Sequence, residues 1–268
     1  MTLKKIESFS RYQEIVDLYN QKGCWSNDYL QSEAESLIKR GLLFEFSGDS
    51  NAFLFVQKDG FFRVYYYVND PTEITPFEGG EFVTEILFRG FQGEPEAQIE
   101  YLLLCGFQRH LTRDLMIAKY VDFIDVVRDP GLLIRDAISL DEVRWAAELF
   151  NSVFDKWSGD YIPPSDYERL LGTKAILLAK DAQGNLLGAF ESGVEKNVNW
   201  LRHFAITESA RGHGVGKALL NAVIEKGHLD EKSRYMLWVQ HQNEIAVKMY
   251  ENKGFKYAGK SSLSMIKL

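Results

Sequence analysis

A short glycine-rich loop constrains this chain more than any other feature. Residues 211–217 read Arg-Gly-His-Gly-Val-Gly-Lys, follow an apolar segment that ends at Ile206, and precede a stretch with the apolar spacing of a helix. Glycines at such a place let the backbone curl so that several N–H groups point into one hollow. Together with the positive end of a helix dipole, these groups form a site for an anion such as a pyrophosphate.

Two common phosphate-binding motifs do not match this loop. A P-loop has four residues between its first glycine and its Gly-Lys pair, whereas three residues separate Gly212 from Gly216 here, and Ala218 stands where the P-loop has Ser or Thr. A dinucleotide fingerprint has two residues between its second and third glycines, whereas one separates Gly214 from Gly216. Taken alone, the loop is equally consistent with a flexible turn.

The pattern of elements around the loop predicts a mixed α/β (α+β) fold. The Pro-Gly step in residues 128–131 is the best linker, so we expect one domain over residues 1–130 and a second over 131–268. In the second, Ser139 and Glu142 form a capping box at the start of a helix. The other expected elements are a short helix from about residue 164, strands at 132–135, 175–179, 186–194, 200–206, 235–239 and within 255–268, and helices at 214–226 and 244–253.

The first half repeats this pattern in part. Its expected helices span 10–20, 27–40 and 95–104, and its expected strands span 52–57, 61–68 and 83–88. Ala97, Tyr101, Gly106-Phe107 and Met116-Ile117 recur as Ala246, Tyr250, Gly254-Phe255 and Met265-Ile266 at a nearly constant spacing, which favours a duplication. However, only residues 69–81 stand where the second half has residues 195–234. That segment is too short for a strand, a glycine loop and a helix, so we expect a single phosphate loop.

Composition excludes several function classes. The chain is 46% hydrophobic and 26% charged, as globular proteins are, and its net charge of -7 argues against nucleic acid as the main partner. No apolar run is long enough to span a membrane. The two cysteines, Cys24 and Cys105, are expected to be thiols in a reducing compartment, so we expect a cytoplasmic protein. The five histidines lack metal-ligand spacing, so we expect no metal, and the sequence does not indicate an oligomeric state.

The loop is one of three motifs in a fixed order. They are Phe204-Ala205-Ile206, then Arg211-Gly212-x-Gly214-x-Gly216, then Asn243-x-x-Ala246-x-x-x-Tyr250-x-x-x-Gly254-Phe255. In this respect residues 132–268 resemble the Gcn5-related N-acetyltransferase (GNAT) family. The resemblance implies two tandem acyl-CoA N-acyltransferase-like domains, each a mixed twisted sheet flanked by helices, with a degenerate N-terminal half.

The resemblance also implies an activity and residue roles. The family transfers an acetyl or other acyl group from acetyl-CoA to an amine, on a small molecule or a peptide. Tyr250 would lie near the thioester sulfur and protonate the leaving thiolate as general acid, and Asn243 would contact the cofactor arm. The implied backbone contacts are to the pantetheine arm from Phe204, Ala205 and Ile206, and to the pyrophosphate from Arg211, Gly212, His213, Gly214, Val215, Gly216 and Lys217.

The general base is left open by the sequence. Alternation back from Phe204 directs Arg202 and Trp200 towards the acceptor and His203 behind the sheet, which predicts a structural role for His203. Glu191 on the preceding strand is the side-chain base that the sequence offers. An ordered water chain, or an acceptor that loses its proton on binding, would serve equally well.

Three side chains are expected on the acceptor side. Arg202 is predicted to bind a carboxylate of the acceptor, with a plain surface arginine as the alternative. Trp157 and Tyr161 lie between the first two helices of the second half, where the resembled family binds its acceptor, with packing against Pro163 and Pro164 as the alternative. The rival for the whole chain is a non-catalytic acyl-CoA-binding or sensing protein. An aminoacyl-tRNA-dependent peptidyltransferase is a further rival, against which the acidic first half and the intact loop argue.

Overall fold

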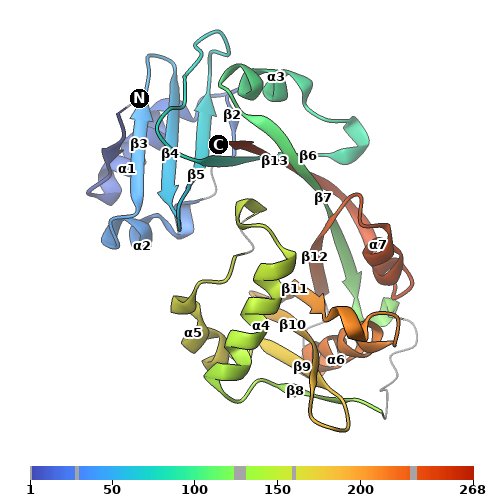
Figure 1. Ribbon diagram of the computed structural model, residues 1–268. Helices are drawn as coiled ribbons and strands as arrows, with labels where there is room; N and C mark the ends of the chain where they lie inside the picture. The colour runs from blue at the N-terminus through green and yellow to red at the C-terminus, as the bar shows by residue number, and fades with distance from the viewer. Residues whose placement is uncertain (1, 28–29, 124–130, 159–160, 230–233) are drawn as a thin grey trace. The chain divides into compact units, whose positions relative to one another are not determined.

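The computed structural model describes residues 2–27, 30–123, 131–158, 161–229 and 234–268. Its chain forms two compact units, one of residues 1–112 and 260–268 and the other of residues 113–259. Each unit is a mixed sheet with helices on both faces (Figure 1), so the mixed α/β class expected from the sequence is confirmed. No helix in the described ranges has both the length and the apolar character needed to cross a membrane.

The second unit orders its strands β7-β12-β11-β10-β9-β8. All neighbours are antiparallel except β11 and β12, which run parallel. The strands are β7 (Gln108–Lys119), β8 (Leu133–Asp136), β9 (Ile176–Lys180), β10 (Leu186–Glu195), β11 (Val198–Ile206) and β12 (Arg234–Gln240). The one parallel neighbour pair is joined through a helix, as a parallel connection requires.

Helices cover both faces of this sheet. Helices α4 (Leu140–Val153) and α5 (Tyr167–Gly172) share a core with Ala189 and Ala205, while α6 (Val215–Leu229) and α7 (Glu244–Glu251) share another with Phe190 and Leu237. Short 3-10 turns lie at Lys156–Ser158, Pro164–Asp166 and Glu208–Ala210. The predicted capping box of α4 is formed in part: the Ser139 hydroxyl accepts a hydrogen bond from the Glu142 N–H at 3.3 Å, whereas the Glu142 carboxylate accepts one from the Ile138 N–H at 2.9 Å instead of from Ser139.

The first unit has the corresponding order, β1-β3-β4-β5-β6-β13. Its strands are β1 (Lys4–Lys5), β3 (Leu43–Ser47), β4 (Asn51–Gln57), β5 (Phe62–Val68), β6 (Phe82–Phe88) and β13 (Lys256–Lys267), and β2 (Trp25–Ser26) pairs with β5. Its helices are α1 (Phe9–Tyr19), α2 (Ala34–Lys39) and α3 (Glu96–Leu104), with 3-10 turns at Leu30–Ser32 and Gly90–Gln92, while a further 3-10 turn at Tyr120–Asp122 belongs to the second unit. Alternate side chains of β4 enter opposite cores, with Phe53 and Phe55 towards α3 and Ala52 and Leu54 towards α1 and α2.

For this unit the structure corrects one predicted helix and adds one strand. The helix expected over 27–40 begins only at Ala34, because the chain first forms β2 and then uses the Asn27 side chain in hydrogen bonds to β5 and β6. Leu43–Ser47 is a strand that the sequence pattern did not indicate. Consequently β5 corresponds to β11, and residues 69–81 replace only the loop and helix of residues 207–233, not a strand as well.

The units exchange their last strands. The chain leaves the first unit inside β7, whose residues Arg113–Lys119 pair with β12, and it returns inside β13, whose residues Ser261–Lys267 pair with β6. The sequence places the division at residues 130 and 131, whereas compactness places it at residues 112 and 113 and again at 259 and 260. Residues 128–130 of the expected linker lie outside the described residues.

This exchange predicts which fragment folds. A fragment of residues 113–259 retains β7 on β12, including the buried Leu115 and Met116, whereas a fragment of residues 131–268 lacks them and carries the β13 residues that belong to the other unit. We expect the first to unfold in one cooperative urea transition and the second to show none, or a midpoint far lower, when both are followed by circular dichroism. Equal stability of the two fragments would contradict the exchange.

Candidate functional site

The second unit opens where its two parallel strands separate. β11 and β12 pair from Val198–Arg234 to Leu201–Leu237, and no later pair is recorded among the described residues. The separation coincides with a shift in register on the other edge of β11, since Phe190 pairs with Phe204 but Ser192 pairs with Leu201. Two residues of β11 thus oppose one of β10, which is a β-bulge.

The bulge lies at Arg202 and His203, opposite Glu191. It breaks the alternation of side chains, because Leu201 and Phe204, three positions apart, both contact the core beneath α6. The alternation that directs His203 away from the acceptor therefore does not hold across the bulge. His203 instead lines the same cavity as Arg202 and Trp200.

The cavity occupies about 450 Å³ at this opening. It is lined by Arg113 of β7, by Val153 and Phe154 at the end of α4, by Glu195, Trp200, Leu201, Arg202, His203 and Phe204 of β10 and β11, by Trp238, Val239 and Gln240 of β12, and by Asn243, Ala246 and Tyr250 at α7. A volume of this size is in the range of small-molecule sites.

The glycine loop precedes α6, as the sequence predicts. Gly212 and Gly214 have φ values of +78° and +81°, a region that side chains rarely adopt, and a Cβ at either would point into open space. Gly216 serves a different purpose, because a Cβ there would approach the Phe204 ring to 3.2 Å. Arg211 and Lys217 are exposed, and the first N–H groups of α6 have no partner within the helix. The arrangement is suited to holding an anion.

Two of the three cavity-lining residues at α7 have polar side chains. Asn243 is the N-cap, and its side-chain oxygen accepts a hydrogen bond from the Ala246 N–H at 3.1 Å, so its amide NH₂ remains as the donor for a ligand. Tyr250 is 7% exposed and packs edge-on against Phe255. Burial raises the pKa of Tyr250 well above its ordinary value, so its hydroxyl keeps its proton at neutral pH.

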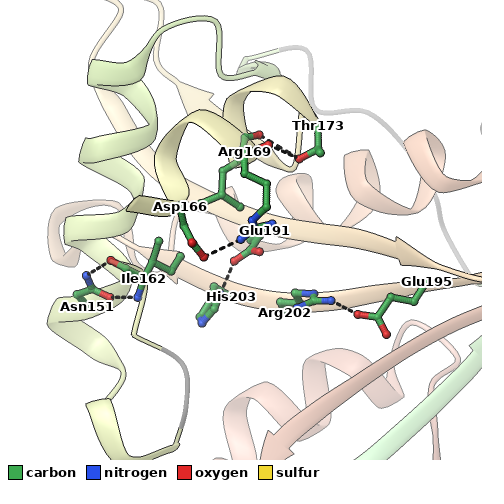
Figure 2. A network of polar contacts seen from close by, with 10 residues as sticks. Asn151, Ile162, Asp166, Arg169, Thr173, Glu191, Glu195, Arg202 and His203 are labelled. Carbon is green, nitrogen blue, oxygen red and sulfur yellow. Dashed lines mark hydrogen bonds and ion pairs between the residues drawn. The ribbon is translucent and has the colours of Figure 1, made fainter. Parts of the chain in front are cut away.

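Glu191 and His203 form a buried pair across the bulge. Figure 2 shows Glu191 on β10 and His203 on β11 directed towards each other, and the Glu191 carboxylate is hydrogen-bonded to His203 Nδ1. Their exposed fractions are 5% and 9%. The His203 ring stacks on Phe150 and meets Phe154 edge-on, both at 5.4 Å between centroids. Such packing and hydrogen bonding fix the orientation of the imidazole.

Of the three residues expected on the acceptor side, Arg202 lines the cavity, whereas Trp157 and Tyr161 do not. Arg202 lines the cavity and forms an ion pair with Glu195 (Figure 2). The Lys156 ammonium lies over the Trp157 ring, 4.0 Å from its centroid, and Tyr161 is 42% exposed. Neither is among the described residues that line the cavity.

Sequence reasoning missed several lining residues. Trp238 and Gln240 belong to a strand whose separation from β11 has no local signal, and Arg113 comes from the exchanged strand β7. For His203, the signal was Glu191 on the neighbouring strand, because a carboxylate at a buried strand position requires a hydrogen-bonding partner.

Comparison with known families identifies this unit. Residues 141–255 match the profile of the Acetyltransferase (GNAT) family. The second unit carries a GNAT domain. The match includes most of the cavity-lining residues and the whole glycine loop of this GNAT domain.

Solved structures share the fold over nearly the full chain. A GCN5-related N-acetyltransferase from Sphaerobacter thermophilus is 15% identical, covers 99% of this chain and 95% of its own, and has a TM-score of 0.60. A tandem GNAT protein from the clavulanic acid biosynthesis pathway is 13% identical, with 99% and 97% coverage and a TM-score of 0.62. A GNAT-family acetyltransferase from Colwellia psychrerythraea is 15% identical, with complete coverage of both chains and a TM-score of 0.57. A comparison with curated proteins gave no match.

Proposed function

We propose that this protein is an N-acetyltransferase that moves an acetyl group from acetyl-CoA to the amine of a small molecule or peptide in the cytoplasm. The observation that carries the proposal is the opening between β11 and β12, which a glycine loop and a helix N-terminus flank within a GNAT domain. A strand edge suits an amide-bearing arm, and the loop suits a pyrophosphate. Both features fit acetyl-CoA.

Each part of acetyl-CoA has residues suited to it. The backbone of Phe204, Ala205 and Ile206 would bind the pantetheine arm, and an N–H in this stretch would stabilise the oxyanion that forms when an amine attacks the thioester. The loop from Arg211 to Lys217 would hold the pyrophosphate through backbone N–H groups. The amide NH₂ of Asn243 would donate to the arm, since its oxygen is used by the helix cap.

Tyr250 would supply the proton that the leaving thiolate takes up. Its raised pKa keeps the hydroxyl protonated, and it lines the cavity close to Asn243 on the same helix. A protonated hydroxyl positioned at the leaving group acts as a general acid.

The Glu191–His203 pair would take the proton that the attacking amine loses. His203 lines the cavity, whereas Glu191 lies behind it and holds Nδ1, so the imidazole would accept the proton and the carboxylate would stabilise the resulting charge. This proposal retains Glu191 in the base function but lets it act through His203.

The acceptor would lie against an aromatic wall. Phe154, Trp200 and Trp238 line the cavity, and Arg202 lies at its edge beside Glu195. We propose this wall as the acceptor side, with Arg202 binding an anionic group of the acceptor. Trp157 and Tyr161 would contact only an acceptor that extends beyond the cavity.

The loop assignment predicts weaker cofactor binding in Gly214→Val. A residue other than glycine is strained at φ +81°, and its side chain would project into the open space beside the loop, where the ligand is proposed to bind. We expect the affinity for CoA in calorimetry to fall at least tenfold, about 1.4 kcal/mol. Gly184→Val is the matched control, since Gly184 has φ +86° and open space in a hairpin away from the cavity. An unchanged affinity in folded Gly214→Val would overturn the assignment.

The proposed role of Tyr250 at the leaving group predicts that Tyr250→Phe affects turnover but not CoA binding. This variant keeps the ring against Phe255 and removes only the proton. We expect near-normal CoA affinity, with turnover in a thiol-release assay over a panel of amines reduced by about 10²-fold or more. Full turnover with chemistry rate-limiting would leave Tyr250 a packing residue. CoA binding by the wild-type chain without thiol release on any amine would instead favour a sensing protein.

The proposed role of the Glu191–His203 pair predicts that the losses of activity on changing either residue are not additive. We expect His203→Ala and Glu191→Gln each to lower kcat/KM by about 10²-fold or more, and the double variant to lose little beyond the larger single loss, because the two side chains act as one unit. In both single variants activity should recover as the pH rises and more acceptor amine is already deprotonated. Additive losses with an unchanged pH profile would indicate that the pair only supports the fold.

A further inference from the structure

The first unit contains the same strand opening as the second, and the chain itself fills it. β5 and β6 run parallel, pair from Phe62–Phe82 to Val64–Thr84, and have no later pair recorded among the described residues. These strands hold the places that β11 and β12 hold in the second unit, since both pairs follow from corresponding sheet orders.

Segment Trp25–Asn27 occupies this opening. β4 covers one edge of β5 along its whole length, so β2 pairs with the other edge, at Trp25–Val68 and Ser26–Tyr67, beyond the point where β6 leaves. β2 therefore lies on the strand edge that in the second unit is left for the pantetheine arm.

The Asn27 side chain bridges the two separating strands. Its oxygen accepts a hydrogen bond from the Tyr66 N–H on β5 at 2.8 Å. Its NH₂ group donates to the Glu85 carbonyl at 2.8 Å and to the Thr84 hydroxyl at 3.0 Å on β6. Asn27 is 7% exposed. A carboxamide carbonyl thus sits on a backbone N–H of β5, as a thioester carbonyl would sit on β11.

The surroundings of this segment are closed as well. The Trp25 ring meets the Tyr101 ring of α3, the helix that corresponds to α7, edge-on at 6.3 Å. The Tyr101 hydroxyl donates a hydrogen bond to the Glu73 carbonyl at 3.3 Å, and Glu73 belongs to the segment that replaces the glycine loop. The helix-ending bonds from Phe107 to Leu102 and from Phe255 to Tyr250 place Leu102, not Tyr101, at the position of Tyr250.

We infer that Trp25–Asn27 is an internal ligand of the first unit, which occupies permanently the strand opening that acyl-CoA enters in the second. The comparison with acyl-CoA rests on the proposed function, whereas the occupancy of the opening does not. The first unit would thus be closed to such a ligand for a second reason besides its lack of a glycine loop. Even a ligand that needed no phosphate site would find this strand edge and the Tyr66 N–H already occupied.

Hydrogen exchange on the full chain tests this inference at single residues. We expect the Tyr66 amide to be protected in the ligand-free protein and unaffected by added CoA, while amides of β11 beyond Arg202 gain protection only with CoA. Titration should give one CoA per chain. Rapid exchange at Tyr66, protection that appears there only with CoA, or two bound CoA molecules would each overturn the inference.

A pair of asparagine variants makes the test specific. Asn27→Ala should speed exchange at Tyr66 at least tenfold, whereas Asn20→Ala, at the exposed end of α1, should leave it unchanged. If Asn27→Ala does not fold, Asn27→Asp keeps an acceptor for Tyr66 but loses the donor to Glu85, so exchange should quicken on β6 and not at Tyr66. Unchanged exchange at Tyr66 in folded Asn27→Ala, or unchanged exchange on β6 in Asn27→Asp, would overturn the inference. If no CoA bound at all, the proposed function would fail while the Tyr66 results still decided this one.

Discussion

The cavity of the second unit depends on the separation of its two parallel strands, β11 and β12. Once β11 and β12 stop pairing after Leu201 and Leu237, their backbone groups and the side chains between them are available to a ligand. The bulge at Arg202 and His203 accompanies this separation and turns His203 towards the cavity while Glu191 stays buried behind it. In the proposed function, the loop before α6 and Tyr250 on α7 serve one ligand only because β11 and β12 separate beside them.

The sequence predicted the features that local chemistry determines. The loop at 211–217 lies just before a helix, and Ser139 caps α4, because glycine conformations and side-chain caps depend on neighbours within a few residues. The strand Leu43–Ser47 escaped detection because Glu45 stands on its buried face. The structure explains this charge by two hydrogen bonds of 2.8 Å from Arg11 on α1, a partner that lies far along the chain.

Features that depend on distant pairing were not predictable. The alternation of β11 would have been right without the bulge, but the bulge is a mismatch between two strands and leaves no mark within either. The cavity residues Arg113 and Trp238 come from strands that meet only through the exchange of β7. The residues suited to the acid and to cofactor binding could be named from a motif, whereas the pairing of Glu191 with His203 required the fold.

The strand exchange also limits how a gene for this protein can be rearranged. A recombination break in the segment around residue 130 falls at the linker that the sequence indicates, yet each product would lack its final sheet strand and carry one that belongs to the other. A half that lost its partner would expose a bare strand edge, which invites pairing with other chains. We therefore expect the two units to be retained together, with substitutions on each sheet limited to those that still allow the exchanged strand to pair.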